Sequence, residues 1–255
     1  GSSAIWLTLA LLERFTGTAM SKKLFPGGAG SGAGATDVEE GTSDDDGEED
    51  LEASARSKYF FMIGKYIIGV APLLACATYF VAAYAIPGQL ELYNKKFIFI
   101  HEYDLGYIFL AWFMLYLARH YLSINANGAR AAAKVERPDQ HAYQVGKLVD
   151  GPKVLMTNAG VDGRFNRAQR AAFNMDESLP LFCTGLILAG TVFGPFVLLP
   201  AALSVYGRIQ FGNLYKESVE GRGAGFMPAM AAELYTSGLV LLCAVKGLAG
   251  DLIPV

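Results

Sequence analysis

The sequence predicts an all-α, polytopic membrane protein, and two observations support that prediction. Of the 255 residues, 53% are hydrophobic and only 18% are charged, whereas a soluble domain carries about 25% charged residues. The apolar residues also gather in runs long enough to cross a bilayer, which takes about 20 residues. This composition excludes a soluble globular enzyme, a disulfide scaffold and a disordered protein.

Residues 1–58 are predicted to form a polar, acidic and disordered tail. The first 52 positions hold three basic and eleven acidic residues, whereas the rest of the chain holds 18 and 13. The segment 25–52 is rich in Gly, Ser and acids, so it has little apolar surface to bury. The apolar run 4–12 is too short to span a membrane. It is compatible with a targeting remnant, a surface helix or translated sequence upstream of Met20.

Five membrane-spanning helices are predicted after the tail. The first, at 66–90, has no charged residue and forms an extra N-terminal transmembrane helix within the segment 59–104, which ends in a loop. The second lies at 105–129. The uncharged run 178–207 is broken by Gly194-Pro195, and because a Gly-Pro pair marks a turn, we expect spans at 167–193 and 196–215. The last span is 223–245, so residues 105–255 form a four-helix membrane domain.

The basic residues predict the orientation of these spans. Eleven Lys and Arg residues flank the spans on the side of the N-terminus and of the loops 130–166 and 216–222, against three on the other side. Lys and Arg are enriched in cytoplasmic loops. The N-terminus is therefore predicted to lie in the cytosol.

One face of the third span is polar. Four side chains separated by three, four and three positions fall within about 80° of one another on a helix, and they are Arg167, Arg170, Asn174 and Glu177. Ionisable side chains at membrane depth usually face a bundle interior or a wet cavity. The fourth span and the loop after it add three further polar residues, spaced seven apart: Arg208, Tyr215 and Arg222.

This set of side chains suits a small zwitterion rich in carboxylates, because Arg binds carboxylates bidentately. Glutathione has two carboxylates to pair with Arg and one ammonium to pair with Glu177. The thiolate is its nucleophile, and nearby guanidinium groups lower the thiol pKa below the ordinary value of about 8.5. The predicted chemistry is thiolate attack on an apolar electrophile that arrives from the lipid, with hydroperoxide reduction as a related option.

A purely structural interpretation of the same residues stays open. Arg170 and Glu177 can form an intramembrane ion pair, and Arg167 can extend to the lipid headgroups. Tyr215 can belong to the belt of aromatic residues at the membrane surface.

Other classes of ligand find little support in the sequence. The three cysteines lie far apart in apolar runs and form no metal-type pair, so we expect neither a metal site nor a set of disulfides. There is also no basic stripe with interleaved aromatic residues, so we expect no nucleic acid partner.

The pattern Arg167-x-x-Arg170-Ala171-x-x-Asn174-x-x-Glu177-x-x-Pro180 resembles the second-helix signature of the membrane-associated proteins in eicosanoid and glutathione metabolism, the MAPEG family. The microsomal glutathione transferases and the leukotriene-forming synthase belong to this family. The resemblance covers about residues 105–245, which is the size of the family's whole four-helix unit. The turn at Gly194-Pro195 also falls where the family has one.

The resemblance implies a four-helix bundle that assembles as a homotrimer, with glutathione in a cleft between neighbouring protomers near the cytosolic side. It implies thiolate stabilisation by Arg130 and Arg222. It further implies a lipophilic substrate taken from the membrane lipids and an endoplasmic reticulum (microsomal) location, with a mitochondrial or plastid membrane as the alternative. The implied glutathione-binding residues are Arg167, Arg170, Asn174, Glu177, Arg208 and Tyr215.

Three positions depart from the family pattern. Ser178 and Phe211 stand where some members have Tyr, and Ala131 stands where the pattern has the second Arg of a pair that begins with Arg130. Together with the extra first span, these departures favour an alternative function. That alternative is a non-catalytic, lipid-binding member of the same fold or a structural subunit of a larger membrane complex.

Overall fold

The computed structural model describes residues 45–148 and 151–249 of the chain. Helices dominate them. In chain order the elements are α2 (Asp45–Gly64), the π-helical segment η1 (Lys65–Val70), α3 (Ala71–Ala85), α4 (Gln89–Glu102), α5 (Gly106–Ala132), β1 (Tyr143–Leu148), β2 (Gly151–Met156), α6 (Gly160–Phe193), the 3-10 turn η2 (Gly194–Val197), α7 (Leu198–Glu217) and α8 (Arg222–Ala249). The predictions for residues 1–44, including those for the apolar run 4–12, lie outside the described residues.

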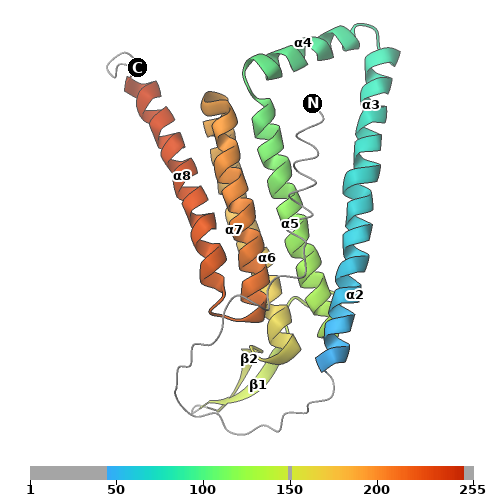
Figure 1. Cartoon of the computed structure of the whole chain (residues 1–255), viewed down its shortest axis with the longest axis vertical. Coiled ribbons are helices and arrows are strands. Elements are labelled where there is room, and N and C mark those ends of the chain that lie inside the picture. Colours follow the sequence, from blue (N-terminus) through green and yellow to red (C-terminus); the bar gives the residue numbers. More distant parts are fainter. Residues whose placement is uncertain (1–44, 149–150, 250–255) are drawn as a thin grey trace, which may run out of the picture. The chain divides into compact units, whose positions relative to one another are not determined.

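Within these residues, four helical stretches are long and apolar enough to cross a membrane, namely Gly47–Ala85, Gly106–Ala132, Gly160–Glu217 and Arg222–Ala249. The third stretch contains both α6 and α7, which pack against each other after the chain reverses at η2 (Figure 1). Gly194 makes this reversal possible because it has a positive φ of 50°. The predicted turn at Gly194-Pro195 and the predicted all-α membrane fold are thus confirmed, with α5, α6, α7 and α8 as the four-helix bundle.

The helix before the bundle begins earlier than predicted. Residues 45–58, which we expected to belong to the disordered tail, form most of α2. The prediction was wrong there because α2 packs on α5 and pairs Glu52 with residues more than a hundred positions away, and such contacts are invisible in a local charge pattern. The assignment of this helix as an extra membrane span stays a prediction, although Gly47–Ala85 has the length and composition for one.

The predicted span 66–90 also ends earlier, at Ala85. Ile86 is extended (φ −108°, ψ 115°) because it precedes Pro87, and Gly88 then takes a left-handed conformation with φ 78°. Instead of the predicted loop, the chain continues as α4, which leads to α5.

The bundle packs through small and aliphatic side chains. Its core cluster includes Leu115 and Leu122 of α5, Met175 of α6 and Ala201 of α7. The outward side chains are mostly large, apolar and exposed, as expected for helices surrounded by lipid rather than water.

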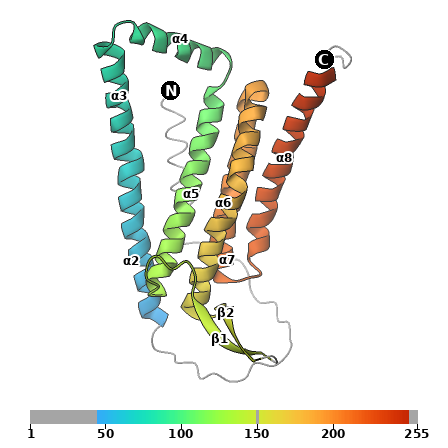
Figure 2. The ribbon, with the colours of Figure 1, turned by 180° about the vertical axis from the view of Figure 1, so that it is seen from behind.

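A β-hairpin projects from the predicted loop 130–166, beyond the start of α6 (Figure 2). Its two antiparallel strands pair Tyr143 with Met156 and Val145 with Val154. The buried amide of Asn166 fixes the base of the hairpin to α6, because its Nδ2 donates to the carbonyl oxygens of Ala142 (2.9 Å) and Thr157 (2.8 Å) and its Oδ1 accepts from the Ala142 N–H (2.8 Å).

Candidate functional site

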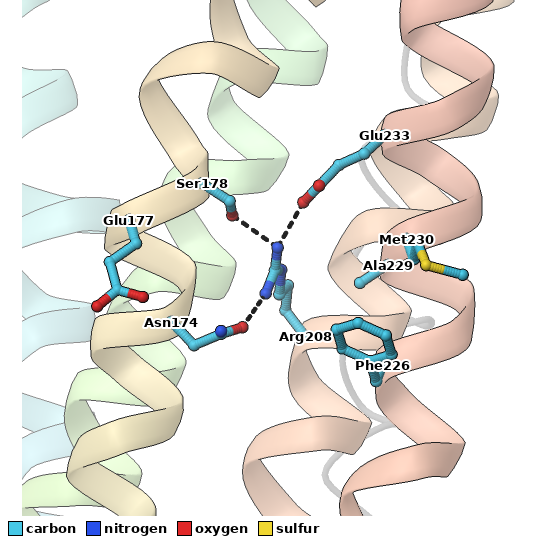
Figure 3. Close-up of a pocket in the computed structure, with 8 residues that line it drawn as sticks. All are labelled: Asn174, Glu177, Ser178, Arg208, Phe226, Ala229, Met230 and Glu233. Atoms are coloured by element: carbon cyan, nitrogen blue, oxygen red, sulfur yellow. Dashed lines mark hydrogen bonds and ion pairs between the residues drawn. The ribbon is translucent and has the colours of Figure 1, made fainter.

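The centre of the candidate site is the guanidinium group of Arg208, which α7 places between α6 and α8 (Figure 3). Its Nη2 donates to the Ser178 hydroxyl (2.6 Å) and to the Glu233 carboxylate (2.6 Å), and its Nη1 donates to the Asn174 side-chain oxygen. The Arg208 side chain is only 8% exposed. A buried charge requires such pairing, because an unpaired guanidinium in a low-dielectric interior costs several kcal/mol.

A cavity of about 250 Å³ opens beside Arg208. Polar groups come to it from α6 and α7, and α8 adds apolar side chains and one carboxylate (Figure 3). The lining residues are Asn174, Glu177, Ser178, Arg208, Phe226, Ala229, Met230 and Glu233. The cavity therefore combines a cation, two carboxylates and an amide with an apolar wall, which is the combination that an amphipathic ligand requires.

The predicted polar stripe of α6 is present at the edge of this cavity. Arg170 binds Glu177 bidentately, with distances of 2.7 Å (Nη1–Oε1) and 3.2 Å (Nη2–Oε2). Both side chains are about half exposed, so solvent or a ligand can reach the pair. The structure thus places Arg170 and Glu177 in the ion pair that the structural interpretation foresaw, whereas Asn174 of the same stripe bonds Arg208 instead.

Arg167 does not reach the cavity. Its guanidinium is buried and donates to three backbone carbonyl oxygens, those of Asn158 (2.6 Å), Lys216 (3.0 Å) and Glu217 (3.4 Å). These bonds join the start of α6 to the end of α7, where carbonyl groups lack helical partners. Within one chain, Arg167 is a structural tie and neither contacts the cavity nor extends to the headgroups.

Tyr215 and Arg222 also lie away from the cavity. Tyr215 is half-buried, and its ring packs against that of Phe211 with 5.2 Å between centroids. Arg222 is exposed at the first position of α8. Neither residue lines the cavity around Arg208.

Arg130 lies on a different side of α6. Its guanidinium stands 4.8 Å from the centroid of the Phe165 ring and donates to the carbonyl oxygens of Glu136 (3.3 Å) and Asp139. It lines a second cavity of about 400 Å³, to which α6 contributes Gln169, Ala172 and Phe173. On α6 these positions point about 150° away from Asn174 and Ser178. One chain alone therefore does not bring Arg130 to Arg208.

Several functional candidates escaped the sequence analysis. Glu233 is the only charged residue in the predicted span 223–245, and that isolation could have marked it, because ionisable residues inside a span are usually functional. Arg119 and Asp176 form a bidentate ion pair between α5 and α6, with 2.8 Å from Nη2 to Oδ2. Nothing in the sequence pairs Arg119 with Asp176, because the two residues lie 57 positions apart.

His141 lies in the connection between α5 and β1, against the Phe173 ring (5.9 Å between centroids). Partial burial lowers the pKa of His141 below its ordinary value, and the positive charge of Arg170 lowers it further. The imidazole therefore favours its neutral form beside the polar stripe of α6. Within the described part of the chain, no cluster of three or more His, Cys, Asp or Glu side chains could hold a metal ion.

The fold and this geometry define a helical membrane protein with an arginine-centred polar site among three helices of a four-helix bundle. The model of the MAPEG family matches residues 108–242, which is more than half of the chain and runs from α5 into α8. The chain belongs to the MAPEG family. No curated protein matches it.

Proposed function

We propose that the protein is a membrane-embedded, glutathione-dependent transferase or peroxidase that acts on lipophilic electrophiles or lipid hydroperoxides. Membership of the MAPEG family supports a function related to glutathione or eicosanoids. The observation that carries the proposal further is the accessible Arg170–Glu177 pair at the edge of the cavity around Arg208. These two side chains offer one charge of each sign to a zwitterionic tripeptide.

Each site residue has a task in this proposal. Arg170 exchanges the Glu177 carboxylate for a carboxylate of glutathione, and Glu177 then accepts the ammonium group. Asn174 adds an amide donor and acceptor. Arg208 keeps its three partners and holds Asn174 in place, while Phe226 and Met230 of α8 offer the apolar wall for the second substrate.

The chemistry follows from the thiolate. Guanidinium groups favour the anion and so raise the fraction of glutathione that is nucleophilic. In a transferase reaction the thiolate sulfur forms a bond to the electrophilic carbon, and the leaving group departs with its electron pair. In a peroxidase reaction two glutathione molecules are oxidised to the disulfide, and the hydroperoxide is reduced to an alcohol and water.

A homotrimer is part of the proposal because one chain is incomplete. Arg130, the implied partner of the thiolate, lines a cavity on the far side of α6 from Arg208. A neighbouring copy can present its Arg130 to the Arg170–Glu177 side of the first chain, and a ring of such contacts closes without free ends. Arg222 and Tyr215, at the ends of α8 and α7, would complete the same site.

Glutathione binding to the purified protein tests the proposal. We expect isothermal titration calorimetry to detect binding by the wild type and a loss of at least about tenfold in affinity for Arg170→Ala, equivalent to about 1.4 kcal/mol. The matched control is Lys95→Ala, which breaks another exposed ion pair (Glu91–Lys95, 2.8 Å) at the opposite end of the bundle. Wild-type protein that binds no glutathione would refute the proposed function.

Mixed oligomers test the shared site. Arg130→Ala and Arg170→Ala chains, each inactive in conjugation to a chlorinated aromatic, are co-expressed with different tags and purified through both tags. In a trimer that carries both tags, one of the three interfaces combines an intact Arg130 with an intact Arg170, so about a third of the sites are restored and partial activity should return. If the mixture stays as inactive as either parent, Arg130 and Arg170 do not act across an interface.

The alternative is a non-catalytic lipid-binding protein or a structural subunit of a larger membrane complex. The observation that favours it is the complete pairing of the site, since Arg208 has three partners and Arg170 is bound to Glu177. Conjugation activity of the detergent-purified oligomer would exclude this alternative, whereas stable copurification with other subunits and no glutathione binding would establish it.

A further inference from the structure

Helix α4 connects the ends of two helices that can each cross a membrane. The stretch Gly47–Ala85 ends just before it, and the stretch Gly106–Ala132 begins just after it. Both views show α4 running across from the end of α3 to the start of α5 (Figures 1 and 2). Sharp turns fix this course, because Gly88 has φ 78° and Asp104 has φ 54°. A helix that joins two spans at their ends lies at the level of the bilayer surface.

The two sides of α4 differ in chemistry. Leu90, Tyr93, Phe97 and Ile100 fall within about 80° of one another around the helix axis. Three charged residues, Glu91, Lys95 and Glu102, fall within about 40° on the opposite side. Glu91 and Lys95 pair with each other at 2.8 Å, and their side chains are 75% and 70% exposed. Two of the three charges thus satisfy each other, and the exposed side chains of Ile98 and Phe99 stand at the borders of the charged stripe.

An aromatic contact shows which way the apolar side points. Tyr79 of α3 stacks on Tyr93 with 5.8 Å between ring centroids and meets Phe97 at 6.1 Å. Tyr79 lies six residues before the end of α3, which is about 9 Å back along that helix. The face with Tyr93 and Phe97 is therefore turned along α3 toward the membrane interior, and the charged side is turned away from it.

The described residues cover the apolar side of α4 only in part, because Leu90, Tyr93 and Ile100 are half-buried and Phe97 is exposed. No residue of α4 is buried, and Phe97 is 55% exposed. In the neighbouring α3 only Ala83 is buried. Lys96 and His101 flank the apolar face, where their charged or polar ends can reach the headgroups while their stems follow the helix. A partly exposed apolar face that contains a Tyr and lies between two candidate spans fits the lipid boundary.

We propose that α4 is an interfacial helix that lies in the plane of the membrane, with Leu90, Tyr93, Phe97 and Ile100 inserted at the boundary between headgroups and acyl chains. Its partner is the lipid of the leaflet at the α3–α5 end of the bundle. Because α3 makes few buried contacts of its own, this insertion holds the α2–α3 arm in place beside the bundle. The inference is independent of glutathione binding and of catalysis.

Spin labels on the full-length protein test the proposal. The background is the chain with its three native cysteines replaced by Ala. Two variants of it, Lys95→Cys and Phe97→Cys, are each labelled with a nitroxide at the new cysteine and reconstituted in phosphatidylcholine vesicles. Both positions are exposed in the protein itself, so a difference between them reports the surroundings of the protein. Glu91→Cys and Tyr93→Cys repeat the comparison with a second pair.

Collision with two relaxation agents distinguishes the environments. We expect the labels at 93 and 97 to collide mainly with oxygen, which dissolves in acyl chains, and those at 91 and 95 to collide mainly with a water-soluble nickel chelate. A nickel response at all four positions would overturn the proposal, because α4 would then lie in water. Low collision with both agents at 97, the exposed position of the apolar face, would also overturn it, because a protein surface would then cover that face. Unchanged circular dichroism and oligomer size show that each labelled variant is folded.

Discussion

Three buried polar side chains of this protein have all the partners they need, which explains how charges fit among apolar helices, whereas the buried side-chain oxygens of Asn125 and Thr157 accept no hydrogen bond from the described residues. Arg208 has three side-chain acceptors, and Arg167 has three carbonyl oxygens. Asn166 makes three hydrogen bonds at the base of the hairpin. The hydrogen bonds of each group offset its desolvation cost only while all of its partners remain. Removal of one partner therefore lowers the stability by more than the bond itself contributes. Substitutions at these sites therefore act on structure as well as on any bound ligand.

His141 makes the stability of the protein depend on pH. Because its pKa is lowered in the folded state, the unfolded chain binds the proton more readily, so folding is favoured when the imidazole is neutral. Stability is fully present above the unfolded pKa of about 6.5 and falls as the pH drops below it toward the folded pKa. We expect His141→Gln to show a weaker loss of stability between pH 7.5 and about 5, measured by thermal unfolding in detergent. Parallel pH profiles for the two proteins would contradict this.

The elements were predictable where the apolar run alone defines a helix, and not where distant contacts do. The spans that became α5, α7 and α8 needed only run length and the Gly194-Pro195 turn. In contrast, α2 is highly charged, and its helical state depends on packing against α5. The helix α4 is short and mixed in composition, and the hairpin needs Asn166 of α6 to fix its base. Local propensity is a weak guide where tertiary contacts decide.

The crossing of α7 and α8 depends on two glycines. A Cβ at Gly225 would stand 2.0 Å from the Phe211 nitrogen, and one at Gly207 would stand 2.5 Å from the Ala229 nitrogen. Both obstacles are backbone atoms, which cannot rotate aside, so the helices must separate. We expect Gly225→Ala to lower the free energy of unfolding by about 1–3 kcal/mol, measured by denaturant titration in detergent.

The matched control for this substitution is Gly238→Ala in the same helix, where a Cβ meets nothing within 4 Å. Alanine favours a helix over glycine by up to about 1 kcal/mol, so this variant should be as stable as the wild type or more stable. Equal effects at the two positions would show that the close approach of α7 and α8 is unimportant.

At the scale of the whole molecule, the sequence predicted which residues share a helix face but not which faces meet. The α6 stripe of Arg170, Asn174 and Glu177 follows directly from a period of 3.6 residues. The partners of Arg208 on α8, and the turning of Arg167 toward the end of α7, depend on how helices are rotated against one another. That rotation is set by packing, such as the Gly207–Gly225 contact, and no spacing within a single helix reveals it. Arg130 shows the same limit, because its position on the far side of α6 from Arg208 depends on the same rotation.

A buried group of charges attaches the N-terminal helix to the bundle. Glu52 of α2 pairs with Lys216 at the end of α7 and with Arg164 of α6 (3.2 Å). The side chains of Glu52 and Lys216 are only 7% and 5% exposed. Glu217 lies 3.4 Å from Lys216 and 3.2 Å from Arg164, but its own side chain is half exposed. The carboxylate of Glu52 therefore attaches α2 to α6 and α7, in addition to the packing of α2 on α5.

Replacement of that carboxylate should release α2. We expect Glu52→Leu to lower the free energy of unfolding by about 3 kcal/mol, at the lower end of the usual range for a broken buried pair, because Glu217 still partly neutralises Lys216. Hydrogen exchange should rise in α2 more than in α6 or α7.

The double variant Glu52→Leu/Lys216→Met removes both charges and should recover most of the loss, since an apolar pair of similar size often substitutes for a buried ion pair. Glu49→Leu, at an exposed position of the same helix, is the control and should change little. If the double variant were as unstable as Glu52→Leu, the buried Lys216 charge would not be the cause, and the attachment of α2 would have to come from its packing on α5 instead.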